Sequence, residues 1–202
     1  IIPGGYALSR KDFVGRNAIM MLLTFTMFFS GGLIPTYILV SNIGLLNTRT
    51  VLVILGSVTV FNIIVTRTYF MSNIPDELFE AASIDGCGNF RFFISIVLPL
   101  SKTIISVIAL YVAVWQWNSY FNALIYATNR KLLPLQIVMR ELLIQGQSLT
   151  STEDLDAASI KYMMEIAQLF KYGVIVVSTL PIILVYPFLQ KYFEKGVMIG
   201  SV

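Results

Sequence analysis

The chain has 202 residues, of which 56% are hydrophobic and 12% are charged, and its mean hydropathy is +0.78. Soluble domains carry about 25% charged residues, so this composition predicts a polytopic membrane protein, and the small net charge of +3 argues against a nucleic-acid partner. With one cysteine and no histidine, an intrachain disulfide framework is excluded, and zinc sites and histidine-based catalysis are disfavoured.

Residues 1–9, IIPGGYALS, are mostly apolar, and the basic residues Arg10 and Lys11 follow them. A signal peptide has the opposite order. We therefore interpret 1–9 as the end of a second membrane span and expect the sequence to be a fragment that lacks the N-terminal spans.

Four further spans are predicted, because a spanning helix needs about 20 mostly apolar residues. Gly31, Gly32 and Pro35 interrupt the first of them, either as a hinge or as a static kink at a packing site. Arg67 lies near the end of the second, where a long basic side chain can reach the interface. The expected spans are 18–40, 51–71, 103–128 and 168–189.

The polar segments 72–102 and 129–167 should face opposite sides of the membrane, since successive spans alternate in direction. Lysine and arginine mark the cytoplasmic side. The side of 72–102 has the larger set, so we place it in the cytoplasm together with the tail 190–202. The basic residues on this side are Arg10, Lys11, Arg16, Arg67, Arg91, Lys102, Lys191 and Lys195. Those on the opposite side are Arg49, Arg130, Lys131, Arg140, Lys161 and Lys171.

The segment 72–102 predicts two short helices joined by a turn. Pro75 suits a first helical turn, Asp76 and Glu77 complement the helix dipole, and Gly86 suits the left-handed end of a helix. A second helix from about 89 to 97 would place Phe90, Phe93, Ile94 and Val97 on one face, and Pro99 would end it. From these residues alone, a surface loop that merely connects two spans is an equally good interpretation.

The spacing of this segment resembles the EAA motif of ABC-importer permease subunits. Glu80-Ala81-Ala82, three residues, Gly86, nine residues and then Ile96-x-Leu98-Pro99 match all defining positions, and Asp85 precedes the glycine as in many members. ALSRKDFVGRN at 7–17, WQWNSYFNALIY at 115–126 and QKYFEKGVMIGSV at 190–202 are similar to the carbohydrate, maltose-permease-like branch. Cys87 and Thr103 depart from commoner residues outside the defining positions.

The resemblance implies an all-α, polytopic transmembrane helical bundle with a cytoplasmic coupling helix, forming one permease domain over 1–202. Such a subunit sits in a bacterial-type inner membrane, forms half of a translocation pathway, and has no ATPase site of its own. The implied partners are a cytoplasmic ATPase dimer that uses ATP and magnesium, a second permease as heterodimer partner, an extracytoplasmic solute-binding protein and membrane lipid. No cofactor, metal or catalytic residue is expected in this chain.

The resemblance also implies roles for particular residues. The plug that enters the ATPase cleft would consist of Glu80, Ala81, Ala82, Asp85 and Gly86. The loop would be anchored on the membrane helices by Phe90, Phe93, Ile96, Leu98 and Pro99, although simple packing is the more ordinary role for phenylalanine.

A polar and aromatic face is predicted in the span 103–128. Tyr111, Trp115, Asn118 and Asn122 recur at helical spacing there. They could line a sugar pathway, because amides hydrogen-bond hydroxyl groups and rings stack on C–H faces. The two asparagines could equally join neighbouring helices by hydrogen bonds.

The outer loop 129–167 would contact the solute-binding protein, with Ser151 or Thr152 capping a helix. The tail from Gly196 to Val202 would lie against the ATPase dimer, or be disordered. Two alternatives are a secondary transporter, disfavoured because the spans contain no Asp, Glu or His, and the permease of a non-sugar ABC importer. An intramembrane enzyme is disfavoured because no G-x-S-x-G or H-E-x-x-H motif occurs.

Overall fold

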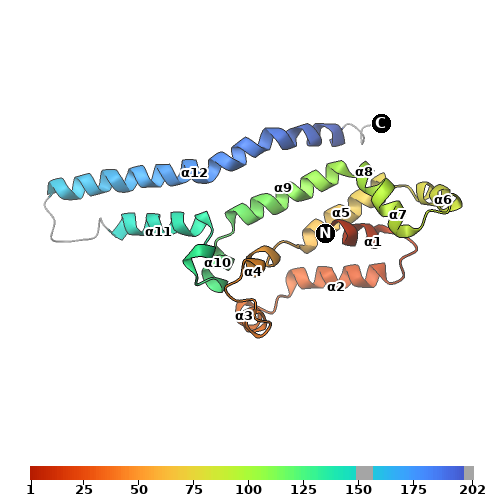
Figure 1. Ribbon diagram of the computed structural model, residues 1–202, viewed down its shortest axis with the longest axis horizontal. Coiled ribbons are helices and arrows are strands. Elements are labelled where there is room, and N and C mark those ends of the chain that lie inside the picture. Colours follow the sequence, from red (N-terminus) through yellow and green to blue (C-terminus); the bar gives the residue numbers. More distant parts are fainter. Residues whose placement is uncertain (149–156, 198–202) are drawn as a thin grey trace. The chain divides into compact units, whose positions relative to one another are not determined.

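The computed structural model describes residues 1–148 and 157–197, and these residues form helices joined by turns and loops, without a strand among them (Figure 1). The helices, in chain order, are α1 (Ile2–Ser9), α2 (Arg16–Phe28), α3 (Leu33–Asn42), α4 (Arg49–Ile54), α5 (Val60–Asn73), α6 (Asp76–Ile84), α7 (Asn89–Phe92), the π-helix η1 (Phe93–Val97), α8 (Leu98–Leu100), α9 (Lys102–Asn118), α10 (Phe121–Tyr126), the 3₁₀ helix η2 (Arg130–Leu132), α11 (Leu135–Ser148) and α12 (Ala157–Val197).

The described chain forms two compact units. Unit 1 contains 1–36, 56–113 and 189–202, and unit 2 contains 37–55 and 114–188. One boundary falls at Gly56, which has φ +87° and lies in the break between α4 and α5. Each unit has its own buried apolar cluster, so each can be described by itself.

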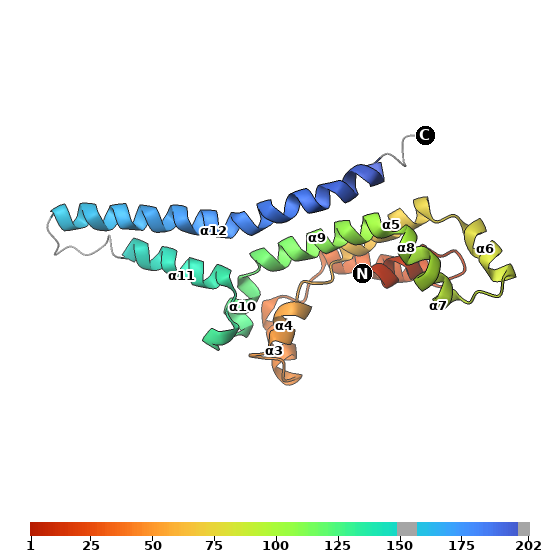
Figure 2. The same cartoon turned by 45° about the horizontal axis from the view of Figure 1, so that its top comes forward.

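Unit 1 is organised around a cluster of buried side chains from α5 to α9. Phe92 and Val97 are completely buried, and α1 packs alongside α5 (Figure 1). The cluster consists of Phe70, Ala82, Phe92, Val97, Ile104 and Ile108, with Tyr6, Leu78, Phe79, Phe93 and Ile96 among the partly buried residues around it. Helix α6 is joined to α5 and α7 by short connections (Figure 2).

Unit 2 has a smaller cluster where α3, α4 and α10 meet. Val40, Val51 and Tyr126 are buried in it, and the Tyr126 ring stacks on the Tyr37 ring at a centroid distance of 5.9 Å. Asn47, with φ +57°, joins two loops, because its side-chain oxygen accepts hydrogen bonds from the Thr128 amide at 2.6 Å and the Thr128 hydroxyl at 2.7 Å. These contacts fix the loop before α4 to the loop after α10.

Three of the predicted spans are divided into shorter helices in the structure, and the first divides at the glycines that the sequence had marked as an interruption. The range 18–40 is divided into α2 and α3, which meet at 114° beside Gly32 with φ +86°. The range 51–71 breaks before Thr59, whose hydroxyl caps α5 by accepting from the Asn62 amide. The range 103–128 breaks between α9 and α10, whereas 168–189 lies within the longer α12.

The described helices were compared with the length and apolar composition that a membrane crossing needs. None meets both requirements alone, but two bent pairs do so together: α2 with α3, and Asn89–Leu100 with α9, which are bent by 80°. Apolar composition marked these regions in the sequence, whereas single glycines and caps decide where each helix stops.

Close packing of α1 on α5 requires a glycine at position 5. A β-carbon there would lie 2.6 Å from Thr66 Cγ2 and 3.2 Å from the Arg67 backbone nitrogen. Thr66 is completely buried, and its hydroxyl donates to the Asn62 carbonyl at 2.7 Å, so it has no room to move. The end of α1 is also joined to α5, because Arg67 Nε donates to the Leu8 carbonyl at 3.0 Å.

We predict that Gly5→Ala lowers the stability of the protein by about 1–3 kcal/mol, the usual effect of an overpacked contact. Gly4→Ala is the matched control, because a β-carbon at Gly4 meets nothing within 4 Å. Thermal unfolding of the detergent-solubilised protein measures the difference. Equal stability of the two variants would contradict the close approach of α1 and α5.

Candidate functional site

Helix α6 begins and ends as its sequence predicts. Pro75 precedes the first turn, which contains Asp76 and Glu77. Gly86 has φ +77°, and two backbone hydrogen bonds close the end of the helix, from Gly86 to the Ser83 carbonyl at 3.0 Å and from Cys87 to the Ala82 carbonyl at 2.9 Å. This pair of bonds is the Schellman motif, which requires a left-handed residue that only glycine adopts without strain.

The predicted plug residues lie on two sides of α6. Glu80, Ala81, Asp85 and Gly86 are exposed, whereas Ala82 is 8% exposed and belongs to the buried cluster of unit 1. Ala82 therefore packs α6 onto the rest of the unit, while the other four residues are available to a partner.

Ile84 is an exposed residue of α6 that the sequence did not single out. It is 88% exposed and lies at the C-terminal end of the helix, next to Asp85. Ile84 thus lies on the exposed side of α6, together with Glu80 and Asp85. The signal in the sequence was an isoleucine out of step with the apolar face that contains Leu78 and Ala82.

The anchor of the segment differs in part from the prediction. Phe93, Ile96 and Leu98 are partly buried as expected, but Phe90 is 77% exposed and Pro99 is exposed. Phe92, which was not predicted, is completely buried, and its ring meets that of Phe79 edge to face at 5.1 Å.

A π-helical turn accounts for the part of the predicted face that differs. The residues 93–97 form a π-helix, which has more residues in each turn than an α-helix. Phe92 and Val97, five positions apart, consequently share the buried side. The α-helical spacing had selected Val97 together with Phe90, Phe93 and Ile94, and it had not selected Phe92. The bend of 80° then follows at Ser101, just after Pro99.

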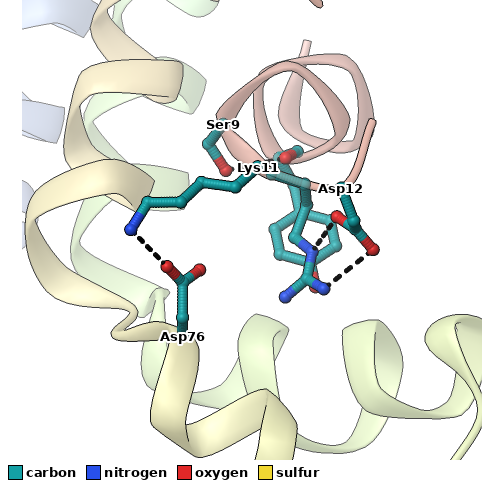
Figure 3. A network of polar contacts seen from close by, with 6 residues as sticks. Ser9, Lys11, Asp12 and Asp76 are labelled. Atoms are coloured by element: carbon teal, nitrogen blue, oxygen red, sulfur yellow. Dashed lines mark hydrogen bonds and ion pairs between the residues drawn. The ribbon is translucent and has the colours of Figure 1, made fainter. Parts of the chain in front are cut away.

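The segment after α1 contacts the start of α6, a contact that no pattern in the sequence had indicated. Lys11 Nζ lies 2.7 Å from an Asp76 carboxylate oxygen, and Arg10 makes two hydrogen bonds of 2.9 and 3.0 Å to Asp12 (Figure 3). The guanidinium of Arg10 also lies over the Phe79 ring, 3.8 Å from its centroid. The hydrogen bond to Asp76 raises the pKa of Lys11, and the one from Arg10 lowers the pKa of Asp12.

The predicted pathway face is divided between two helices. Tyr111 and Trp115 are exposed on α9, at 45% and 57%. Asn118, the last residue of α9, is exposed and donates to the Val114 carbonyl of its own helix at 2.8 Å. Asn122 lies on α10 and donates to the Leu55 carbonyl at 3.2 Å, which is the helix-joining role left open by the sequence.

Asn122 has a neighbour with a similar role in unit 2. Gln116 Nε2 donates to the Leu52 carbonyl at 2.8 Å. Leu52 and Leu55 belong to the last turn and C-cap of α4, whose carbonyls have no partner within the helix. The two amides therefore complete the end of this six-residue helix. Trp117 makes a comparable bond to the Ser178 carbonyl of α12 at 2.9 Å.

Some predicted features fall outside the described residues. These are the cap at Ser151 or Thr152 and most of the tail after Gly196. In the part of the chain that is described, no group of three Cys, Asp or Glu residues is placed to hold a metal ion.

Comparison with known proteins identifies relatives along the whole chain. The chain is 42% identical over 197 residues to the polygalacturonan/rhamnogalacturonan transport system permease protein YtcP of Bacillus subtilis, covering 98% of this chain and 68% of YtcP. It is 43% identical to protein LplC of the same organism, covering 98% of this chain and 65% of LplC. The chain thus spans about two thirds of the length of these relatives.

A solved structure has the same fold. It is described as the crystal structure of a bacterial ABC transporter involved in the import of the acidic polysaccharide alginate, and it matches with a TM-score of 0.79 and 31% identity over 96% of this chain and 67% of that one. The family model for binding-protein-dependent transport system inner membrane components matches residues 1–199. The chain therefore belongs to this family of inner-membrane transport components, the permeases of ABC importers.

Proposed function

We propose that the chain is the transmembrane subunit of an ATP-driven, solute-binding-protein-dependent importer of oligosaccharides. It forms half of the translocation pathway, and a second permease forms the other half. A cytoplasmic ATPase dimer binds ATP and magnesium and hydrolyses the ATP. Relatives named for polygalacturonan and rhamnogalacturonan and for melibiose, raffinose and stachyose support a carbohydrate substrate. The family assigns the chain a transport role, not an enzymatic one.

The observation that carries the coupling role is the exposed side of α6. Glu80, Asp85 and Ile84 are exposed on a nine-residue helix whose opposite side, at Ala82, is buried in the core of unit 1. Small Ala81 permits close approach, and carboxylates fix the register of a docked helix through charge-assisted hydrogen bonds. A partner that docks here contacts a helix already attached to α5, α7 and α9.

Site-specific crosslinking tests this docking. In the full-length protein with Cys87→Ala, we expect Ser83→Cys to capture the co-expressed ATPase subunit, and capture to change when ATP is added. Ser83 is exposed on α6, which makes it accessible. Ser41→Cys, exposed near the end of α3 and predicted on the opposite side of the membrane, is the matched control. No capture at Ser83, together with labelling only from outside, would reverse the topology and favour a secondary transporter.

We predict that Glu80→Lys uncouples transport from ATP hydrolysis. Glu80 is exposed, and within the described residues it makes no ion pair, so folding should be unaffected, whereas reversing a docked charge should reduce uptake at least about tenfold. Glu80→Gln should give an intermediate loss of uptake.

Gly86→Pro should also uncouple transport from ATP hydrolysis, because proline cannot adopt φ +77°. Uptake equal to the wild type at equal protein levels would refute the coupling role.

The two asparagines of the predicted pathway should behave differently. Asn122→Leu leaves the Leu55 carbonyl without its donor and should cost about 1 kcal/mol of stability. Asn118→Leu removes only a bond to its own helix and should reduce oligosaccharide uptake with little change in stability. Uptake into vesicles and thermal unfolding in detergent separate the two effects. Equal loss of stability in both variants would mean that Asn118 supports the fold.

A further inference from the structure

The segment Ser9–Asp12 contacts two places on α6. Lys11 pairs with Asp76 in its first turn (Figure 3). Arg10 lies over the ring of Phe79, one turn later in α6. Both contacts come from residues that directly follow α1. We call Arg10, Lys11, Asp76 and Phe79 the α1–α6 contact.

The two halves of this contact differ in burial. The side chains of Lys11 and Asp76 are 77% and 40% exposed, so water screens their attraction and the pair contributes little by itself. The Arg10 side chain is only 15% exposed, and the bidentate bond to Asp12 fixes the plane of its guanidinium against Phe79. A cation over a ring gains strength when it is shielded from water, so Arg10 and Phe79 carry most of the contact.

Each end of the contact is attached to a helix of unit 1. Arg67 of α5 donates to the Leu8 carbonyl, and Gly5 lies directly against Thr66, so the end of α1 cannot move independently of α5. On the other side, Phe79 meets the fully buried Phe92 edge to face. Arg10 therefore connects a packed helix pair to the aromatic core under α6.

The covalent connection after α6 contains two glycines with free space around them. It runs through Asp85–Gly88, which includes Gly86 and Gly88, and a β-carbon added at either glycine would meet no neighbouring atom within 4 Å. Glycine permits more backbone conformations than any other residue, so this unobstructed turn can absorb a displacement of α6 by local rotation. A side-chain contact to α1 does not pass through it.

We propose that Arg10 is a positioning residue for coupling: through Phe79 it fixes α6 to the end of α1, so that a displacement of α6 by its partner also moves the α1–α5 pair. This inference rests on the proposed function, because it assumes that an ATPase docks on α6. The inference adds Arg10, a residue outside 72–102, to the residues that couple α6 to the membrane helices. The motion of α6 would reach α1 through the contact of the Arg10 cation with the Phe79 ring.

The test uses the full-length permease assembled with its partners in vesicles, and the measured quantity is oligosaccharide uptake per ATP hydrolysed. Phe79→Leu keeps apolar packing on Phe92 but removes the ring, and should lower this ratio about threefold or more. Phe79→Tyr keeps the ring and should stay near the wild-type ratio. Arg10→Gln should resemble Phe79→Leu. Arg16→Gln should not, because Arg16 lines the same pocket as Asp76 but forms no ion pair with α6 in the described part of the chain.

Capture of the ATPase at Ser83→Cys is measured in each variant. The expected result is normal capture and continued hydrolysis in Phe79→Leu and Arg10→Gln, with uptake reduced. A ratio unchanged in Phe79→Leu, with capture intact, would overturn the role of Arg10 while leaving the proposed function standing. Absence of capture in the otherwise unaltered protein would remove the proposed function, and this inference with it.

Discussion

The complete burial of Phe92 is the constraint on which the rest of unit 1 depends. Phe79 of α6 meets this ring edge to face, and Phe70 of α5, Ile104 and Ile108 of α9 belong to the same cluster. A short amphipathic helix such as α6 is not stable in isolation, so its orientation comes from this packing. Because Ala82 and Phe79 pack into the cluster, Glu80, Ile84 and Asp85 lie on the opposite, exposed side.

Much of the segment 72–102 could be predicted from sequence because its signals are local. Pro75, the acidic first turn and Gly86 each act within a few residues, and the structure has the helix and the left-handed turn where they indicate. The anchor could not be predicted as well, since the π turn at 93–97 changes the spacing on which periodicity arguments rest. Arg10 and Lys11 were missed because their partners on α6 are distant in sequence, and no local pattern encodes such a pair.

In the predicted spans, the ends of the individual helices were harder to predict than the apolar regions themselves. Uncharged runs located the apolar regions, but Gly32, Gly56 and the Thr59 cap divide them into shorter helices. Helices that end inside an apolar region leave carbonyls without partners, and such groups are costly away from water. Gln116 and Asn122 satisfy two of them at the end of α4. Asn122, which the sequence had suggested for substrate contact, and Gln116, which had not been singled out, thus both support the end of α4 in unit 2.

The π turn also constrains how this segment can vary in length. A π-helix differs from an α-helix by one inserted residue, so deleting any one residue from 93–97 would restore α-helical winding at no loss of hydrogen bonding. The residues on either side would keep their orientation, because the deleted residue is the one that the π turn accommodates. Phe92 and Val97 would then be four positions apart, a spacing that also places two residues on one side of an α-helix. Deletion of an exposed residue such as Ser95 should therefore be tolerated among descendants of this gene, whereas a further insertion beside it should be purged.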